Sequence, residues 1–207
     1  MKKILNLPHR GHLQLWKGEL WGKAMKGFLL GAFVAGIFMA NLMGREAVSN
    51  AGILNDYFIE KFRYTDINAE HLFFYILEER LPLLLLLLFL MFSALGLLSS
   101  VLVLGWQGFS VGFMLSTGIA KYGLKGILLV LGGLLPQYVC YLAAYGGYFG
   151  FALFLRQRLR GEYFLEKKYA YGMGALAAIL LLLLFVTGIF LESYVNPVIL
   201  KNILKLF

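Results

Sequence analysis

Charged residues are scarce in this sequence. They make up 14% of the 207 residues, whereas 60% are hydrophobic and the mean hydropathy is +0.77. A soluble domain has about 25% charged residues, which it needs to cover its surface. The composition therefore excludes an ordinary soluble enzyme and predicts a single domain, residues 1–207, that is embedded in lipid.

Residue types that commonly build active sites and metal sites are also few. Cys140 is the only cysteine, so no intrachain disulfide can form, and the three histidines are His9, His12 and His71. The sequence has no His-Glu-x-x-His motif, and no carboxylate lies inside its long uncharged stretches. The lack of a carboxylate inside these stretches argues against a proton-coupled or cation-coupled transporter, because such transporters usually need an ionisable group within the membrane. We therefore expect no catalytic residue, no cofactor and no metal ion, and we expect that the protein is not an enzyme.

Uncharged stretches mark the parts of the chain that can cross a bilayer. There are four long ones, at residues 27–44, 81–120, 126–155 and 169–191. One crossing needs roughly 20 apolar residues as a helix, so the first and last stretches fit one helix each. The second is long enough for two helices, and Gly105-Trp106-Gln107 is the natural place for a turn between them. We expect these helices over residues 81–103 and 107–120.

The stretch 126–155 is long for one span and contains Gly132, Gly133 and Pro136. Proline lacks the backbone N–H and clashes with the preceding helical turn, so a break is expected there. Either a bent span or a re-entrant hairpin fits, and the Gln137 side chain can satisfy the freed backbone groups. The expected fold class is an all-α, polytopic integral membrane helical bundle with about five transmembrane helices and this kinked or re-entrant segment. Three spans plus a re-entrant pair are the alternative.

Lysine and arginine beside the spans predict the orientation. Residues 1–26 and 156–168 are basic, whereas the loop 44–80 carries more acidic than basic residues. Both basic segments should be cytoplasmic, so five spans place the N-terminus inside, the loop outside and the C-terminus outside. Lys121 and Lys125 then lie outside, whereas the three-span alternative puts them inside. The net charge of +8 is concentrated in the basic segments and indicates contact with anionic lipid headgroups rather than nucleic acid.

Amphipathic segments flank the spans. Residues 12–25 have an apolar face at helical spacing and are expected to lie flat on the inner membrane surface. A C-terminal amphipathic tail, residues 192–207, contains a similar helix that begins at Pro197. In the outer loop, Asn68 can cap a helix that runs to Leu77.

Small residues spaced by four form ridges on two predicted spans. The ridges consist of Ala32, Gly36, Ala40 and Gly44 on the first span, with Gly27, Gly31 and Ala35 as a second ridge, and of Gly108, Gly112, Ser116 and Ala120 on the third. Small residues let helix backbones approach closely, which is how helices associate in lipid. The ridges predict packing within the bundle, the docking of a partner's transmembrane helix, or self-association. Asn41 can form a hydrogen bond across helices.

Four tyrosines share one helical face just after Pro136. They are Tyr138, Tyr141, Tyr145 and Tyr148. Such hydroxyls commonly bond neighbouring helices or lie in the interfacial aromatic belt. If the stripe instead lines a pathway, the protein is a small multi-pass transporter or channel, which is the alternative function.

An ordered set of motifs runs through the middle of the chain. It comprises residues 73–77, the leucine-rich span from Leu81, Gly108-Phe109-Ser110-Val111-Gly112-Phe113, Tyr122-Gly123-Leu124-Lys125-Gly126 and Leu135-Pro136-Gln137. This order resembles the stage II sporulation protein M family, closely over about residues 73–156 and in length and hydropathy along the whole chain. The candidate positions for helix packing or partner docking are Gly36, Gly44, Gly108, Gly112, Gly123, Gly126, Pro136 and Gln137.

The resemblance implies a function that composition does not. It implies a non-enzymatic, multi-pass scaffold of the cell membrane that acts in the engulfment complex of sporulation. Stage II sporulation proteins D and P are the peptidoglycan hydrolases that such a scaffold recruits and positions at the septal membrane. The wider family also has members outside sporulation, and the resemblance transfers no catalytic residue. Membrane lipids and these two hydrolases are therefore the expected partners.

Overall fold

A computed structural model describes residues 9–43, 60, 64, 66–159 and 164–206 of the chain. The described residues are almost entirely helical, with no strand among them. The elements are α1 (His9–Leu42), α4 (Ala69–Met91), α5 (Gly96–Tyr122), α6 (Leu124–Leu159), α7 (Phe164–Phe190), a π-helical segment η2 (Leu191–Val195) and α8 (Asn196–Leu204). The expected all-α bundle is confirmed.

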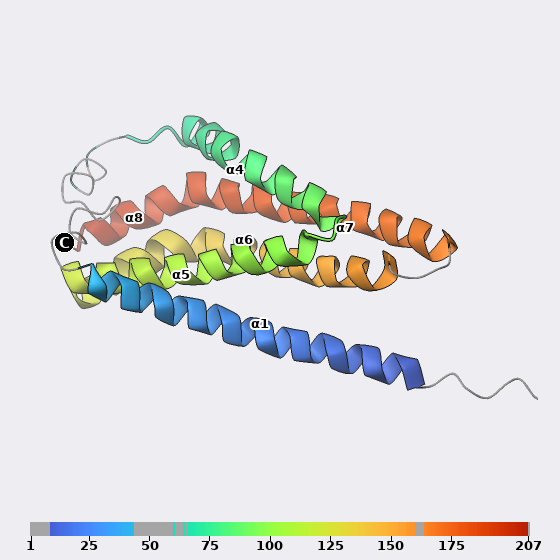
Figure 1. The fold of residues 1–207 in the computed structure, drawn as a ribbon. Coiled ribbons are helices and arrows are strands. Elements are labelled where there is room, and N and C mark those ends of the chain that lie inside the picture. Colours follow the sequence, from blue (N-terminus) through green and yellow to red (C-terminus); the bar gives the residue numbers. More distant parts are fainter. Residues whose placement is uncertain (1–8, 44–59, 61–63, 65, 160–163, 207) are drawn as a thin grey trace, which may run out of the picture.

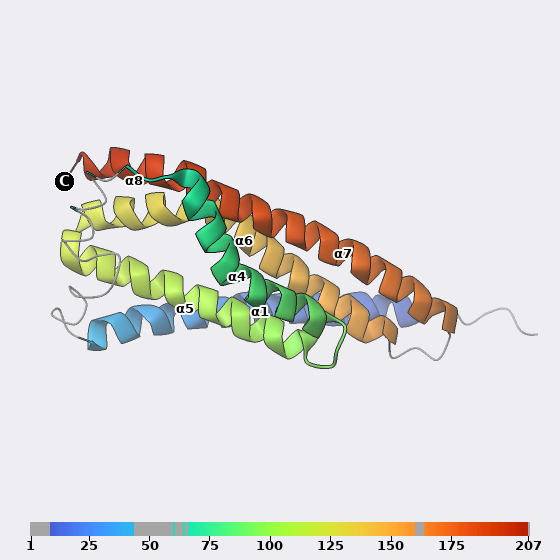
Figure 2. The same cartoon turned by 90° about the horizontal axis from the view of Figure 1, so that it is seen from above.

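The long helices run alternately along one common direction (Figures 1 and 2). α1 begins at the end of the bundle where α6 ends and α7 begins, and α1 ends at the opposite end. That opposite end also holds the connection from α5 to α6 and the end of α8, whereas α4 begins farther along the bundle, near η2. The start of α1 and the end of α8 therefore lie at opposite ends of the bundle.

Four segments are long and apolar enough to cross a membrane. They are Gly22–Leu42, Gly96–Tyr122, Leu124–Arg158 and Lys168–Leu204. The fifth long helix, α4, is not one of them, and it combines a leucine-rich run with Glu78, Glu79 and Arg80. The helix expected from Asn68 to Leu77 does not stop there, because α4 runs without a break from Ala69 to Met91. Asn68 caps that helix as predicted, since its side chain accepts from the backbone N–H groups of Glu70 and His71.

The turn between α4 and α5 lies earlier than the sequence suggested. The chain reverses over residues 92–95, where the Ser93 hydroxyl donates to the Leu90 carbonyl at 2.8 Å and accepts from the Leu95 N–H at 3.1 Å. The predicted turn at 105–107, with helices over 81–103 and 107–120, is wrong. α5 continues through Gly105 because that glycine lies against the Phe28 ring of α1. A continuous helix also keeps its backbone hydrogen bonds, which lipid cannot replace.

α6 is one continuous helix through Pro136, so the re-entrant alternative is wrong and the bent span is right. Its first third and its remainder run in different directions (Figure 2). The Gln137 side chain donates to the Gly133 carbonyl at 2.6 Å, which lies next to the Gly132 carbonyl whose helical donor is missing at Pro136.

Neither terminal segment forms a separate surface helix. α1 runs straight from His9 to Leu42, so residues 12–25 continue the first span in line and do not turn to lie flat. At the other terminus, α7 passes through η2 into α8, which packs on the start of α6 through Leu129 and Leu204. Pro197 lies in the first turn of α8, where its missing N–H costs no hydrogen bond.

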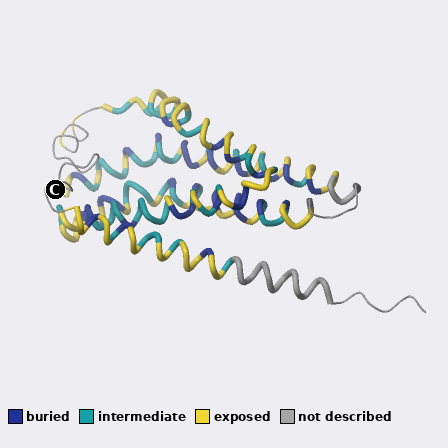
Figure 3. The backbone as a smooth tube through the Cα atoms, viewed as in Figure 1, coloured by how far each residue is buried: buried dark blue, intermediate teal, exposed yellow. Residues whose placement is uncertain are grey.

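The core lies between α4, α5, α6 and α7 (Figure 3). Its most deeply buried large side chains include Met91, Tyr141, Leu155, Phe185 and Ile189. α1 adds Met25 to this core and packs chiefly against α5. Its other faces expose large apolar side chains such as Leu30 and Phe38, which suits a helix surrounded by lipid.

Candidate functional site

Three glycines lie where the backbones of α1 and α5 touch. A Cβ atom at Gly36 would overlap the Phe109 carbonyl oxygen, and one at Gly112 would overlap the Phe33 carbonyl oxygen. A Cβ at Gly108 would lie 2.9 Å from the Leu29 carbonyl oxygen. The contact thus joins the small-residue ridges of two helices that are far apart in sequence, in the manner of close helix pairs in membranes.

The remaining candidate glycines, Gly123, Gly126 and Gly44, are not among the three at the α1–α5 contact. A Cβ at Gly126 would overlap the Gly118 carbonyl oxygen, so this glycine closes the α5–α6 hairpin. Gly123 ends α5 with φ of 59°, a conformation that favours glycine, and nothing lies near its missing Cβ. Gly44 lies outside the described residues. On α1, the ridge of Gly27 and Gly31 has no heavy atom within 4 Å of the positions of the missing Cβ atoms.

Polar side chains reinforce these contacts. The Asn41 amide of α1 donates to the Ser116 hydroxyl of α5 at 3.3 Å, which confirms the expected hydrogen bond across helices. At the kink of α6, Pro136 is partly buried, and Gln137 is 3% exposed. The second Gln137 side-chain atom, Oε1, is buried without a hydrogen-bond partner, as is Oδ1 of Asn196 in α8.

The tyrosine stripe of α6 faces its neighbours. Tyr138 donates to the Gln107 side chain of α5 at 2.6 Å, and the hydroxyls of Tyr148 and Ser99 lie 2.7 Å apart. Tyr145 packs edge-on against the Phe185 ring of α7. The expectation that these hydroxyls bond neighbouring helices is therefore confirmed. The cavity beside Tyr145 and Tyr148 measures about 10 Å³, no more than a single water requires.

An ion pair lies on this same stripe, and we call its three residues, Arg80, Tyr141 and Glu192, the clasp. Arg80 Nη2 of α4 and Glu192 Oε1 of η2 are 2.6 Å apart, and the Tyr141 hydroxyl of α6 donates to Glu192 Oε2 at 2.6 Å. The Arg80 guanidinium lies over the Tyr141 ring, 4.9 Å from its centroid. One carboxylate thus joins three elements.

The clasp was missed by sequence reasoning, which used Arg80 and Glu192 only as limits of uncharged stretches. The two residues are 112 positions apart. A weak local signal does exist, because Glu192 follows a long apolar run without a turn signal. Glu192 lies inside the candidate span Lys168–Leu204, so this apolar segment extends beyond the uncharged stretch that ends at residue 191.

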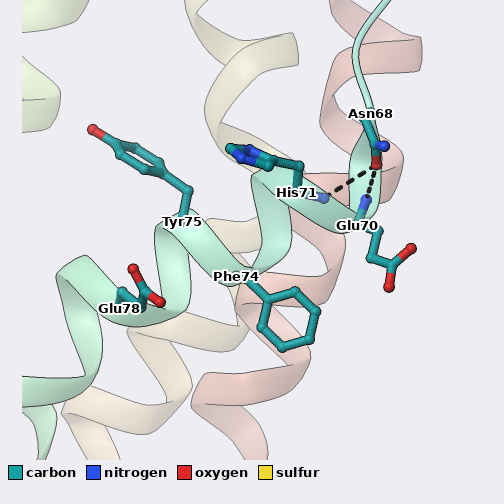
Figure 4. A pocket seen from close by; sticks show the side chains of 6 residues that line it. All are labelled: Asn68, Glu70, His71, Phe74, Tyr75 and Glu78. Atoms are coloured by element: carbon teal, nitrogen blue, oxygen red, sulfur yellow. Dashed lines mark hydrogen bonds between the residues drawn. The ribbon is translucent and has the colours of Figure 1, made fainter.

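A hollow of about 360 Å³ lies on the outer face of α4 (Figure 4). It is lined by Asn68, Glu70, His71, Phe74, Tyr75 and Glu78. Phe74 and Tyr75 are more than half exposed, and Figure 4 shows their rings pointing to different sides of the helix. Within the described part of the chain, no group of three or more histidine, cysteine or acidic residues is placed to hold a metal ion. The hollow therefore combines aromatic and acidic groups without a metal-binding arrangement.

Comparison with known proteins identifies the family of the chain. The family model for stage II sporulation protein M matches residues 25–197, which include all of α4, α5, α6 and α7. A search of curated proteins and a search of solved structures each found no match. Because the family match covers most of the chain, from within α1 to the start of α8, this multi-pass helical bundle belongs to the stage II sporulation protein M family.

Proposed function

We propose that this protein is a non-enzymatic membrane scaffold of the sporulation engulfment complex. Its partners in this proposal are stage II sporulation proteins D and P, the peptidoglycan hydrolases that it recruits and positions at the septal membrane. The observation that carries the proposal is the family match over residues 25–197 of a chain with four membrane-spanning helices. The name of the family refers to sporulation, and the scaffold role and the hydrolase partners are what we add.

The proposed orientation follows from charge. The start of α1, the end of α6 and the start of α7 lie at one end of the bundle (Figure 1), and the sequence around them is basic. Positive flanks stay in the cytoplasm, so this end is cytoplasmic in the proposal. The end of α8 then faces the extracytoplasmic side, where peptidoglycan lies, and the first half of α4, with its hollow, is the half of that helix nearer to this side.

The hollow on α4 supports a docking role for this outer surface. Exposed aromatic side chains are enriched at protein interfaces, and Phe74 and Tyr75 lie beside the carboxylates of Glu70 and Glu78. The pair Glu78 and Glu79 is exposed as well. In the proposal, this surface contacts a partner outside the membrane, while the α1–α5 contact keeps the bundle rigid.

The test is affinity capture of the tagged protein from gently solubilised, sporulating cells, followed by mass spectrometry. The proposal expects both hydrolases with the wild-type protein and a loss of at least about tenfold with Phe74→Ala/Tyr75→Ala. The matched control is Tyr169→Ala, which removes an exposed tyrosine at the opposite end of the bundle. Absence of the hydrolases from an intact and abundant wild-type bait would contradict the scaffold role.

The transporter alternative has one observation in its favour, the intramembrane ion pair of Arg80 and Glu192, since such groups often mark ion pathways. The surroundings favour a structural role instead. Both carboxylate oxygens already have partners, and the cavity beside Tyr145 and Tyr148 on the tyrosine stripe is of single-water size. Substrate flux into proteoliposomes that is abolished by Tyr141→Leu/Tyr145→Leu would support the transporter.

A further inference from the structure

The clasp brings two opposite charges into a largely apolar bundle. The side chain of Glu192 is 16% exposed and that of Arg80 is 36% exposed. Both oxygens of the carboxylate are used, one by the guanidinium and one by the Tyr141 hydroxyl. Removal of either charge would leave the other unpaired next to lipid, which is costly. The ion pair therefore stabilises the contact between α4, which carries Arg80, and η2, which carries Glu192.

The backbone on both sides of the pair is irregular. Glu192 lies in η2, where the Asn196 N–H bonds to the Leu191 carbonyl, one residue farther back than in an α-helix. The Ser193 hydroxyl donates to the Ile189 carbonyl at 2.9 Å. On the other side, Pro82 follows Arg80 by two residues inside α4. Proline weakens a helix at that point, because it removes a hydrogen bond to the preceding turn.

The pairing of η2 with α6 fixes where Glu192 lies. α6 runs antiparallel to η2 and α8, with Leu129 packed on Leu204 and with Leu200 beside the missing Cβ of Gly133. Two turns farther along α6, Tyr141 meets Glu192. α8 and α6 thus hold the acidic half of the clasp in place, and the basic half comes from α4.

α4 depends on this attachment more than the other long helices do. It contacts η2 more than it contacts any other element. The first half of α4, residues 69–81, carries the outer hollow and turns its remaining face, including Ile76, toward the core. Apolar contacts between helices gain little in lipid, because lipid tails are as apolar as the helices. The ion pair is therefore a tie of this half to the bundle in addition to its apolar contacts and to the exposed ion pair of Asp66 with Lys201 of α8.

We propose that the clasp is a conformational device: the contact of Arg80 with Glu192 and Tyr141 holds the first half of α4 against the bundle, and its release lets this half swing about Pro82. Without its partner, Arg80 moves toward the headgroups, where water and phosphate solvate it. This motion displaces the α4 hollow relative to α8. The inference goes beyond the proposed function, because the clasp acts in the protein alone and requires no partner.

The experiment measures the distance from α4 to α8 with spin labels in lipid nanodiscs. Labels are attached at Tyr75→Cys and Val198→Cys, both exposed positions, in a Cys140→Ala background. The unaltered clasp should give one narrow distance distribution. Glu192→Gln and Arg80→Gln should each add a second population at longer distance. The distance distribution of the charge-exchange variant Arg80→Glu/Glu192→Arg should resemble that of the unaltered protein more than the distribution of either single variant does.

A second label pair keeps the result interpretable. Ile119→Cys and Val139→Cys report on α5 and α6, outside the clasp, and their distribution should stay unchanged in every variant. If the control pair broadens together with the α4 pair, the clasp only stabilises the bundle as a whole and the proposal fails. It also fails if Glu192→Gln leaves the α4 distance unchanged. Tyr141→Phe keeps the ring but removes the hydroxyl, so it should produce a smaller second population than Glu192→Gln.

Discussion

The close contact between α1 and α5 makes Gly36→Ala a sharp perturbation. The added Cβ would overlap the Phe109 carbonyl oxygen and lie 2.9 Å from the Phe113 backbone nitrogen. Both atoms belong to backbone, so no rotamer change can make room and the helices must separate. Overpacking typically costs about 1–3 kcal/mol, while alanine in a helix interior recovers about 0.5–1 kcal/mol relative to glycine. We therefore expect a net loss of up to about 2.5 kcal/mol.

Gly31→Ala on the same helix is the matched control. No heavy atom lies within 4 Å of the position of its Cβ, so only the helix-propensity gain of about 0.5–1 kcal/mol remains. The same substitution should thus have opposite signs at two positions of α1. Gly112→Ala should behave like Gly36→Ala, since its Cβ meets the Phe33 carbonyl oxygen of the same contact. The double variant should cost less than the sum, because the first substitution already separates the helices.

The assay is reversible unfolding of the purified protein in mixed micelles with increasing dodecyl sulfate, followed by circular dichroism. The order of stability should be Gly31→Ala at or above wild type, and Gly36→Ala and Gly112→Ala below it. Equal stability of Gly31→Ala and Gly36→Ala would refute the reasoning, because it would mean that the α1–α5 backbones are not in contact.

Three further predictions concern the hairpins, the kink and the orientation. Gly126→Ala should lower the unfolding midpoint in the same assay because its Cβ meets the Gly118 carbonyl oxygen, whereas Gly146→Ala, with open space, should not; equal midpoints would contradict this. Gln137→Leu should change stability by less than about 1 kcal/mol, since losing the bond to Gly133 is offset by removing the unpartnered Oε1. A loss above about 3 kcal/mol would show that this amide is fully satisfied in the membrane. In a Cys140→Ala background, a membrane-impermeant thiol reagent should label Leu124→Cys from outside intact cells but reach Tyr169→Cys only after permeabilisation; labelling of both from one side would overturn the proposed orientation.

Local patterns in the sequence predicted the local structure well. The Asn68 cap and the bond from Gln137 at the proline kink depend on neighbouring residues alone, and both are present. The tyrosine face of α6 follows from helical periodicity. The spacing of Gly36, Gly108 and Gly112 marked residues that lie in the α1–α5 contact, because four-residue spacing puts small side chains on one helix face.

Turns inside a long apolar run were not predictable in the same way. Gly105 looked like a turn residue, yet it serves close packing against Phe28. The true turn at 92–95 depends on the Ser93 hydroxyl, which satisfies the backbone on both sides. Hydropathy does not distinguish these cases, since serine and glycine each occur in transmembrane helices as well as in turns.

The clasp could not be found by counting charges along the chain. Charge counting treats each ionisable residue as a point where the helix leaves the bilayer. Arg80 and Glu192 do not follow this assumption, because the two side chains form an ion pair with each other. Only the fold, which brings α4 and η2 together from distant parts of the sequence, makes the pair visible.

The most direct test of the scaffold role is a binding measurement with purified components. The protein in lipid nanodiscs is titrated with the purified extracytoplasmic domains of stage II sporulation proteins D and P, and binding is followed by biolayer interferometry. The proposal predicts saturable binding of at least one hydrolase, lost in Phe74→Ala/Tyr75→Ala and kept in Tyr169→Ala. No binding of either hydrolase to the folded wild-type protein would contradict it.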